Sequence, residues 1–299
     1  MRRREFLAGL GGIVAASAVR AAEKAVAEPK LDDKPIKLLF TGTGGADWFE
    51  GGNPYGELLT KGKGETRANA GAFLNDRVLI DLTVANAKNL PKDAQPTAIF
   101  YTHSHWDHYQ PKTVARFPSI RRVYVQEGWA NSAEKELRAA CKGAAFEVIP
   151  VRIGETYVEE GMAFVALPGN HWTGREGEQC VIYSVRTAKS HLLYATDTGG
   201  LMAEAYSRLF KLPVITALVM NAMVGPGRRN NQRIFSHSTP EQVLETAQAL
   251  RFACRYYAPK GRPVWTTHLS YAMHGTQAEV EKAYPKGVVP AYDGQVIEV

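Results

Sequence analysis

A chain of 299 residues, 45% hydrophobic and 10% aromatic, is long enough to bury the core of one large domain, which excludes a disordered protein. Its formal net charge at pH 7 is +6, of which residues 1–27 contribute +3. A remaining charge of +3, spread over a whole domain, indicates neither a nucleic-acid partner nor a stable membrane partner. The three cysteines, Cys141, Cys180 and Cys254, are too few and too scattered for a disulfide framework, so we expect buried free thiols.

The first 27 residues have the layout of an export signal. Arg2, Arg3 and Arg4 precede a weakly apolar stretch at residues 6–19, and small residues suited to a signal peptidase follow. The apolar stretch is too short to span a bilayer, which requires roughly 20 residues. Arg3 and Arg4, followed by Glu-Phe-Leu, resemble the twin-arginine pattern, whose export machinery carries folded proteins across the bacterial inner membrane. We therefore expect a periplasmic protein, cleaved after Ala22 or after residues 25–27.

From residue 35 to residue 299 the sequence predicts one continuous domain without repeats or linkers. Short runs rich in β-branched and aromatic residues predict strands, in chain order, at residues 36–40, 78–82, 98–101, 122–125, 146–151, 162–167, 180–185, 191–195, 213–220 and 264–267. Helical patterns fall between them at residues 111–116, 130–141 and 239–250. Ser238 or Thr239 can cap the last helix, with Pro240 in its first turn. This interleaving predicts a layered α/β fold.

Four metal-binding side chains follow the predicted strand at residues 98–101. His103 and His105 are two residues apart, so in an extended chain both imidazoles point to the same side and can reach one metal ion. Asp107 and His108 are displaced as the backbone turns, and they can serve a second ion about 3.5–4 Å away, as two-metal hydrolytic sites require. The run from His103 to His108 therefore predicts a site for two divalent metal ions.

Further ligands are expected in loops after other strands. His171 can complete the first site, Asp197 can bridge both ions, and His268 can complete the second. A set of nitrogen and oxygen donors suits zinc, which we expect first, and also manganese or iron. We interpret His191 and His274 as structural residues.

The order and spacing of these residues resemble the metallo-β-lactamase superfamily over essentially the whole chain after the export signal. The resemblance includes Thr-Gly-Thr-Gly-Gly at residues 41–45, Asp81, the His-x-His-x-Asp-His run, His171, Asp197 and His268. It implies a single-domain αββα sandwich with the metals at one edge. It also implies that Asp81 supports the metal-binding loop from behind, as is usual for such sites.

Phe-Ser-His-Ser-Thr at residues 235–239 resembles the His-Ser-Thr element of the phosphodiesterase branch, which includes ribonuclease Z and phosphoribosyl cyclic phosphate phosphodiesterase. That resemblance implies that His237 acts on the phosphate or on the departing oxygen. The alternative is a structural histidine at the start of a helix. The chain departs from the branch in having no cysteine-rich zinc site, no histidine four residues after His268 and no evident tRNA-gripping arm, so neither relative's substrate is implied.

The resulting expectation is a dinuclear hydrolase of a small or cyclic phosphodiester, an anionic small molecule. Hydroxide held by the two ions attacks, Asp107 orients it, and His237 stabilises the phosphoryl oxygens or protonates the leaving alkoxide. One alternative is a lactonase or β-lactamase-like hydrolase of C–O or C–N bonds, and another is a non-hydrolytic accessory protein of the same fold. The basic loop at residues 225–233 is interpreted as solvated, with an anion contact as the alternative. A homodimer is compatible with the sequence.

Overall fold

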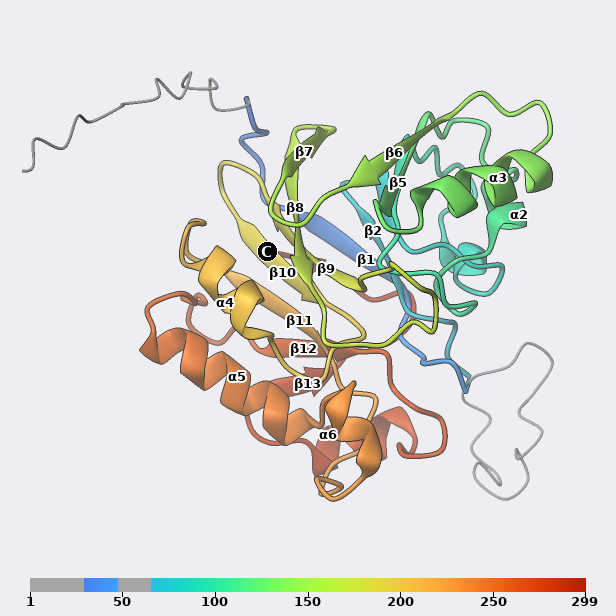
Figure 1. Ribbon diagram of the computed structural model, residues 1–299. Coiled ribbons are helices and arrows are strands. Elements are labelled where there is room, and N and C mark those ends of the chain that lie inside the picture. The colour runs from blue at the N-terminus through green and yellow to red at the C-terminus, as the bar shows by residue number, and fades with distance from the viewer. Residues whose placement is uncertain (1–29, 48–65) are drawn as a thin grey trace, which may run out of the picture.

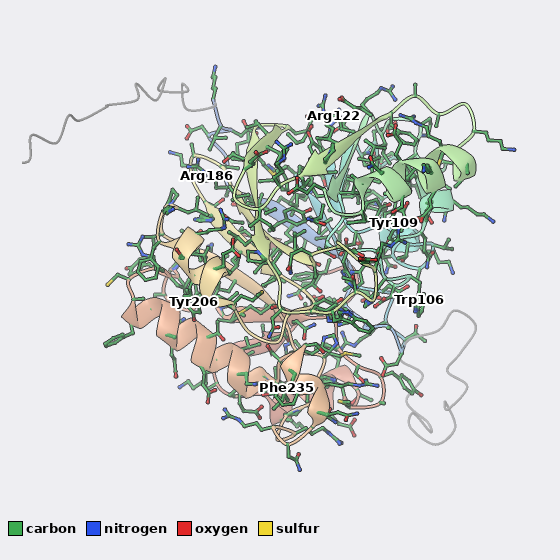
Figure 2. The ribbon with its side chains drawn as sticks, viewed as in Figure 1. Trp106, Tyr109, Arg122, Arg186, Tyr206 and Phe235 are labelled. Atoms are coloured by element: carbon green, nitrogen blue, oxygen red, sulfur yellow. The ribbon has the colours of Figure 1, made fainter. Side chains whose placement is uncertain are left out.

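The computed structural model describes residues 30–47 and 66–299 of the chain. Two mixed β-sheets of seven strands each face one another, and helices cover their outer faces (Figure 1). This single-domain α/β sandwich confirms the fold class that the sequence predicts. The predicted export signal at residues 1–27 lies outside the described residues. Within the described ranges, no helix combines the length and apolarity needed to cross a membrane.

The first sheet has the strand order β14-β1-β2-β3-β4-β5-β6. Its strands are β1 (Lys37–Gly42), β2 (Gly71–Leu74), β3 (Val78–Ile80), β4 (Ala98–Phe100), β5 (Arg122–Gln126), β6 (Glu147–Val151) and β14 (Val296–Glu298). From β3 to β6 the neighbours are parallel, whereas β1 pairs antiparallel with both β2 and β14.

The second sheet has the order β13-β12-β11-β10-β9-β8-β7. Its strands are β7 (Thr156–Glu159), β8 (Met162–Pro168), β9 (Val181–Arg186), β10 (His191–Ala195), β11 (Ala217–Asn221), β12 (Val264–Thr267) and β13 (Val288–Pro290). Strands β10 to β13 are parallel. Strand β9 is antiparallel to both β8 and β10, so β8 runs in the same direction as β10.

Helices α2 (Pro111–Val114) and α3 (Ala130–Ala140) cover the first sheet, and α4 (Ala203–Leu209), α5 (Pro240–Phe252) and α6 (Gln277–Ala283) cover the second (Figure 1). Two short 3-10 helices, η1 (Asn86–Asn89) and η2 (Gln232–Phe235), lie in connections. Thr239 caps α5 in a reciprocal capping box with Gln242, and Pro240 follows in the first turn, as predicted.

Apolar side chains from both sheets fill the space between them. The ring of Phe100 stacks on Tyr124 and on Phe164, with 4.0 Å between ring centroids in each pair. Phe100 and Tyr124 belong to the first sheet and Phe164 to the second, so these contacts join the two layers. Aromatic pairs of this kind add about 0.5–1.5 kcal/mol each beyond the area they bury.

Main-chain and side-chain hydrogen bonds join the sheets where β4 ends. The amide of Val181 donates to the carbonyl of Thr102 at 3.0 Å, and the buried hydroxyl of Tyr183 donates to the carbonyl of Tyr101 at 2.7 Å. Because β3, β4, β8, β10, β11 and β12 end at this edge, the loops that follow them converge there.

The elements depart from the expected ones mainly at their ends. The strand expected at residues 213–220 begins only at Ala217, because before it Ile215 forms only an isolated bridge with Tyr256. Helix α2 ends at Val114 rather than at residue 116. Strands β2, β7, β13 and β14 and helices α4 and α6 were not predicted. The expectation of a buried thiol is wrong for Cys254, which is exposed with a backbone φ of 54° just after α5, while Cys141 and Cys180 are buried.

His191 lies at the start of β10, at the opposite end of the strand from the converging loops, and its ring is held neutral. Its Nδ1 lies 3.0 Å from the carbonyl of Pro213, and its Nε2 lies 2.6 Å from the hydroxyl of Ser184. These two hydrogen bonds agree with the interpretation of His191 as structural. Burial, which the carbonyl of Pro213 only partly offsets, lowers the pKa of His191 to about 4.

His191 should therefore make stability depend on pH. Its pKa is about 4 in the folded chain and ~6.5 in the unfolded chain, so the unfolded state binds more protons between these values. The contribution of the neutral His191 ring to the free energy of unfolding is complete above ~pH 6.5. It falls by about 3 kcal/mol as the pH drops to ~4. We expect His191→Asn to remove this part of the pH dependence. Urea unfolding of metal-free wild type and variant from pH 4 to pH 7.5 measures it, and a constant difference in unfolding free energy would contradict the expectation.

Candidate metal centre

The predicted ligands come together at the edge where the two sheets meet. His103, His105, Asp107 and His108 lie in the loop after β4, His171 follows β8, Asp197 follows β10, and His268 follows β12. Three overlapping groups of side chains each bring their donor atoms within 4.8 Å of one another: His103, His105 and His171; Asp107, His108, Asp197 and His268; and His171, Asp197 and His237. All predicted site residues are thus brought together, including His237.

The first group, called here the histidine set, consists of His103, His105 and His171. Nδ1 of His105 faces Nε2 of His171 at 3.1 Å. Nε2 of His105 donates to the carbonyl of Thr173 at 3.0 Å, which leaves Nδ1 of His105 as a lone-pair donor directed at the set. Two ring nitrogens this close, with a third histidine beside them, are suited to share one cation.

The second group, called here the mixed set, consists of Asp107, His108, Asp197 and His268. Oδ2 of Asp197 lies 2.6 Å from Nε2 of His108, and Oδ1 of Asp197 lies 3.0 Å from Nδ1 of His268. Asp107 closes the set, with Oδ2 at 3.2 Å from Nε2 of His268. Oδ2 of Asp197 is also 3.5 Å from Nε2 of His103, so this carboxylate lies between the two sets, where a bridging ligand belongs.

Asp81 orients His108 and His103 from behind. Its Oδ2 lies 2.7 Å from Nδ1 of His108 and accepts the hydroxyl proton of Thr102 at 2.8 Å. The same Thr102 oxygen, 3.0 Å from Nδ1 of His103, can then accept a proton from that ring. Both rings therefore hold their Nδ1 protons outward and direct Nε2 into the site. This arrangement confirms the supporting position expected for Asp81.

The chemistry of the donors fits a cation. Among the described residues, Nε2 of His103 is buried without a hydrogen-bond partner, and Nε2 of His108, although 2.6 Å from Oδ2 of Asp197, makes no well-aligned hydrogen bond. Such buried nitrogens are costly unless another group satisfies them. Burial raises the pKa of Asp197, but the charges of His268 and His108 outweigh burial and hold that pKa well below its usual range. Burial likewise lowers the pKa of His108, but Asp107, Asp197 and Asp81 together raise it well above 6.5. The mixed set thus demands positive charge, which a proton supplies when no metal is bound.

Three residues of the site have left-handed backbone conformations: φ is 57° at Asp81, 43° at Asp197 and 60° at His268. Each comes directly or closely after a parallel strand. Such conformations cost of order 1 kcal/mol or more outside glycine and persist where surrounding contacts over-determine them. Gly45 packs against this region, since a Cβ there would lie 3.2 Å from the ring of His268.

His237 lies in the loop between η2 and α5, next to Asp197. Nδ1 of His237 is 3.3 Å from Oδ1 of Asp197 and 3.2 Å from the side-chain amide nitrogen, Nδ2, of Asn221. The Asn221 amide also donates to Asp197 at 3.1 Å and lies 3.3 Å from Nδ1 of His268. Burial lowers the pKa of His237, which Asp197 only partly opposes, so the neutral ring is favoured.

Sequence reasoning missed Asn221, Thr102 and Glu178 as parts of the site. Each follows or ends a predicted strand, or lies in the loop of His171, but that position alone does not distinguish it from its neighbours. The remaining candidates behave as structural or surface residues. His274 contacts the carbonyl of Ser270 and the hydroxyl of Tyr284. In the basic loop, Arg229 pairs with the exposed Glu245.

A family model described as a beta-lactamase superfamily domain matches residues 76–258. Because this match spans more than half of the chain, the chain belongs to that family. No curated protein sequence matches the chain.

Solved structures with this fold share little sequence with the chain. Zn²⁺-bound PqqB from Methylobacterium extorquens has a TM-score of 0.63 at 13% identity, and the match covers 88% of this chain and 100% of PqqB. YhfI from Bacillus subtilis, a metallo-beta-lactamase fold protein, has a TM-score of 0.61 at 14% identity, and the match covers 89% of this chain and 100% of YhfI. Human tRNase Z, short form, has a TM-score of 0.60 at 16% identity, and the match covers 87% of this chain and 98% of the tRNase Z chain. These likenesses show the fold. The family and the metal-competent cluster support a metal-dependent hydrolase.

The two donor sets lead to a stoichiometry prediction. We expect purified protein to bind close to two equivalents of zinc, as two-metal hydrolytic sites do. Asp197→Ala should lose most of one equivalent, because Asp197 lies between the sets. Elemental analysis after gel filtration measures both. The control is Asp76→Ala, which removes an exposed aspartate that pairs with Lys37 and should keep both equivalents. One equivalent in the wild type would refute the dinuclear assignment.

Proposed function

We propose that the chain is a dinuclear metal-dependent phosphodiesterase that hydrolyses a small or cyclic phosphodiester. The observation that carries the proposal is the placement of His237 in the same buried cluster as the candidate ligands, 3.3 Å from Asp197. Divalent ions bound to the two sets would activate a water molecule for attack at neutral pH. His103, His105, His171, Asp107, His108, Asp197 and His268 are the proposed ligands, with zinc as the expected metal and manganese or iron as alternatives.

His237 can supply a hydrogen bond to the substrate in either of two states. If Nδ1 accepts from the Asn221 amide, the neutral ring carries its proton on Nε2. If Nδ1 donates to Asp197, Nε2 carries a proton only in the imidazolium form. A proton on Nε2 can stabilise charge developing on a phosphoryl oxygen or can move to a leaving alkoxide. Asp107 is proposed to orient the attacking water.

His237→Ala tests this role. A leaving alkoxide is strongly basic and needs a proton, whereas p-nitrophenolate leaves without one. If His237 protonates the leaving oxygen, the variant should lower kcat by ~10²–10⁴-fold on alkyl cyclic phosphates and by much less on bis(p-nitrophenyl) phosphate. Equal losses on both would indicate charge stabilisation instead.

The control for this experiment is His274→Ala, a histidine outside the donor groups, which should keep wild-type kcat. Each variant must first be shown to hold its metals. Absence of metal-dependent turnover on every diester, with both metals bound, would refute the phosphodiesterase proposal.

Two alternatives would then remain. A hydrolase of lactones or β-lactams should show turnover of those substrates that His237→Ala barely changes. A non-hydrolytic accessory protein of this fold should show none.

We also propose that residues 1–27 direct export of the folded protein through the twin-arginine machinery to the periplasm. The support is the Arg3-Arg4 pair before a weakly apolar stretch. Arg3→Lys combined with Arg4→Lys should leave full-length precursor in the cytoplasm, because the pathway requires the arginine pair. Cell fractionation followed by immunoblotting measures this, and Arg2→Lys is the control. Normal export of the double variant would contradict the proposal.

A further inference from the structure

We propose that Glu178 is a positioning residue that holds the turn between His103 and His105 and thereby fixes the histidine set for metal binding. The inference rests on the proposed metal centre and extends it to a residue in another loop, 74 positions away from its partner Ser104. Neither the histidine-rich run nor its spacing points to this residue.

The carboxylate of Glu178 engages both polar groups of a single residue. Its Oε1 accepts the backbone amide proton of Ser104 at 2.6 Å, and its Oε2 accepts the hydroxyl proton of the same residue at 2.5 Å. The Glu178 side chain has no exposed surface. Hydrogen bonds to a charged acceptor are about twice as strong as neutral ones, and a two-point contact also sets orientation. Ser104 lies between His103 and His105, so this contact fixes the backbone that carries both rings.

The loop that carries Glu178 contacts the histidine set at two other points. The carbonyl of Thr173 accepts the Nε2 proton of His105 at 3.0 Å, and His171 faces His105 at 3.1 Å. Glu178 is therefore the third of three contacts from residues 171–178 to the loop after β4. Together they hold His105 at both ring nitrogens and hold the backbone of Ser104, the residue before it.

The loop itself is anchored on the far side. The backbone amide of Gln179 donates to the side-chain carbonyl of Gln126 at 3.2 Å, and the same oxygen accepts from the amide of Gly128 at 2.9 Å. A Cβ on Gly128 would lie 1.8 Å from the carbonyl oxygen of Gly177, so only glycine permits this close approach. Glu178 thus acts from a fixed support at the end of β5.

Charge gives Glu178 a second reason to affect metal binding. The mixed set contains two carboxylates, whereas the histidine set contains three imidazoles and no carboxylate. Negative charge beside neutral ligands favours a bound cation. Arg175, whose Nε is 3.9 Å from Glu178, also contacts Ser132 and Glu136 and so offsets only part of this charge.

Glu178→Gln keeps the size of the side chain and removes the charge and one acceptor oxygen. We expect it to weaken binding of one metal equivalent ~10–100-fold, the range typical of residues that support metal ligands. The other equivalent, held by the mixed set, should keep wild-type affinity. Ser104→Ala removes only the hydroxyl contact and should cause a smaller loss in the same equivalent. Stepwise Zn²⁺ affinities come from chelator competition, and Co²⁺ absorption spectra report the ligand geometry of each site.

Glu176→Gln is the matched control, because Glu176 is an exposed glutamate in the same loop, and it should bind both equivalents like the wild type. Wild-type affinities and spectra for Glu178→Gln would overturn the inference. An equal loss at both sites with a lowered melting temperature would show that Glu178 only supports folding, which also overturns it. If the wild type binds no Zn²⁺, the proposed metal centre fails as well, so the two failures are distinguishable.

Discussion

The rest of the site depends on the burial of two carboxylates, Asp107 and Asp197, among imidazoles at the edge where the sheets meet. Burying a charge is costly unless opposite charge accompanies it. Asp197 is 1% exposed and has nitrogen atoms of His108 and His268 within 3.0 Å. Burial lowers the pKa of His108, but Asp107, Asp197 and Asp81 hold it well above 6.5, which favours the charged form of that ring beside the carboxylates. A divalent cation balances more of the carboxylate charge and also satisfies the ring nitrogens that lack hydrogen bonds.

This electrostatic constraint explains why the backbone is strained where it is. Asp81, Asp197 and His268 all have positive φ, and each presents a side chain that another part of the cluster holds. Asp81 is fixed by Thr102 and His108, whereas Asp197 is fixed by His108 and Asn221. The packed sheets below supply the stability that tolerates such strain. The strained backbone conformations place the donor atoms of the site precisely.

The sequence predicted the parts of the site that are local or that follow strands. Two histidines two residues apart, after an apolar β-run, already define half a metal site, and His171, Asp197 and His268 could be found because functional loops follow strands at one sheet edge. Glu178 and Asn221 could not be found in this way, because their roles arise from contacts across 74 and 24 positions. Strands β13 and β14 were missed because each has only two consecutive apolar residues before Pro290 or Glu298, whereas the equally short β3 and β4 are apolar throughout. Cys254 was misjudged because a thiol in a left-handed turn after α5 has no core to enter.

The candidate metal ligands and His237 differ in what they would determine. The ligands would supply chemistry common to many hydrolases, whereas His237 would affect which bond is cleaved. The seven candidate ligands need only nitrogen and oxygen donors, and such a set serves many reactions on this fold. His237 differs, because its Nδ1 is shared between Asn221 and Asp197. A cation shared by the two sets would compete with His237 for the charge of Asp197, which favours the side-chain amide of Asn221 as the partner of Nδ1. Since that amide donates, Nδ1 must accept, and the neutral ring then carries its proton on Nε2. The lowered pKa of His237, caused mainly by burial, favours the same neutral state. In the proposed phosphodiesterase, this state of His237 would suit a hydrogen-bond donor to a developing oxyanion more directly than a full proton donor.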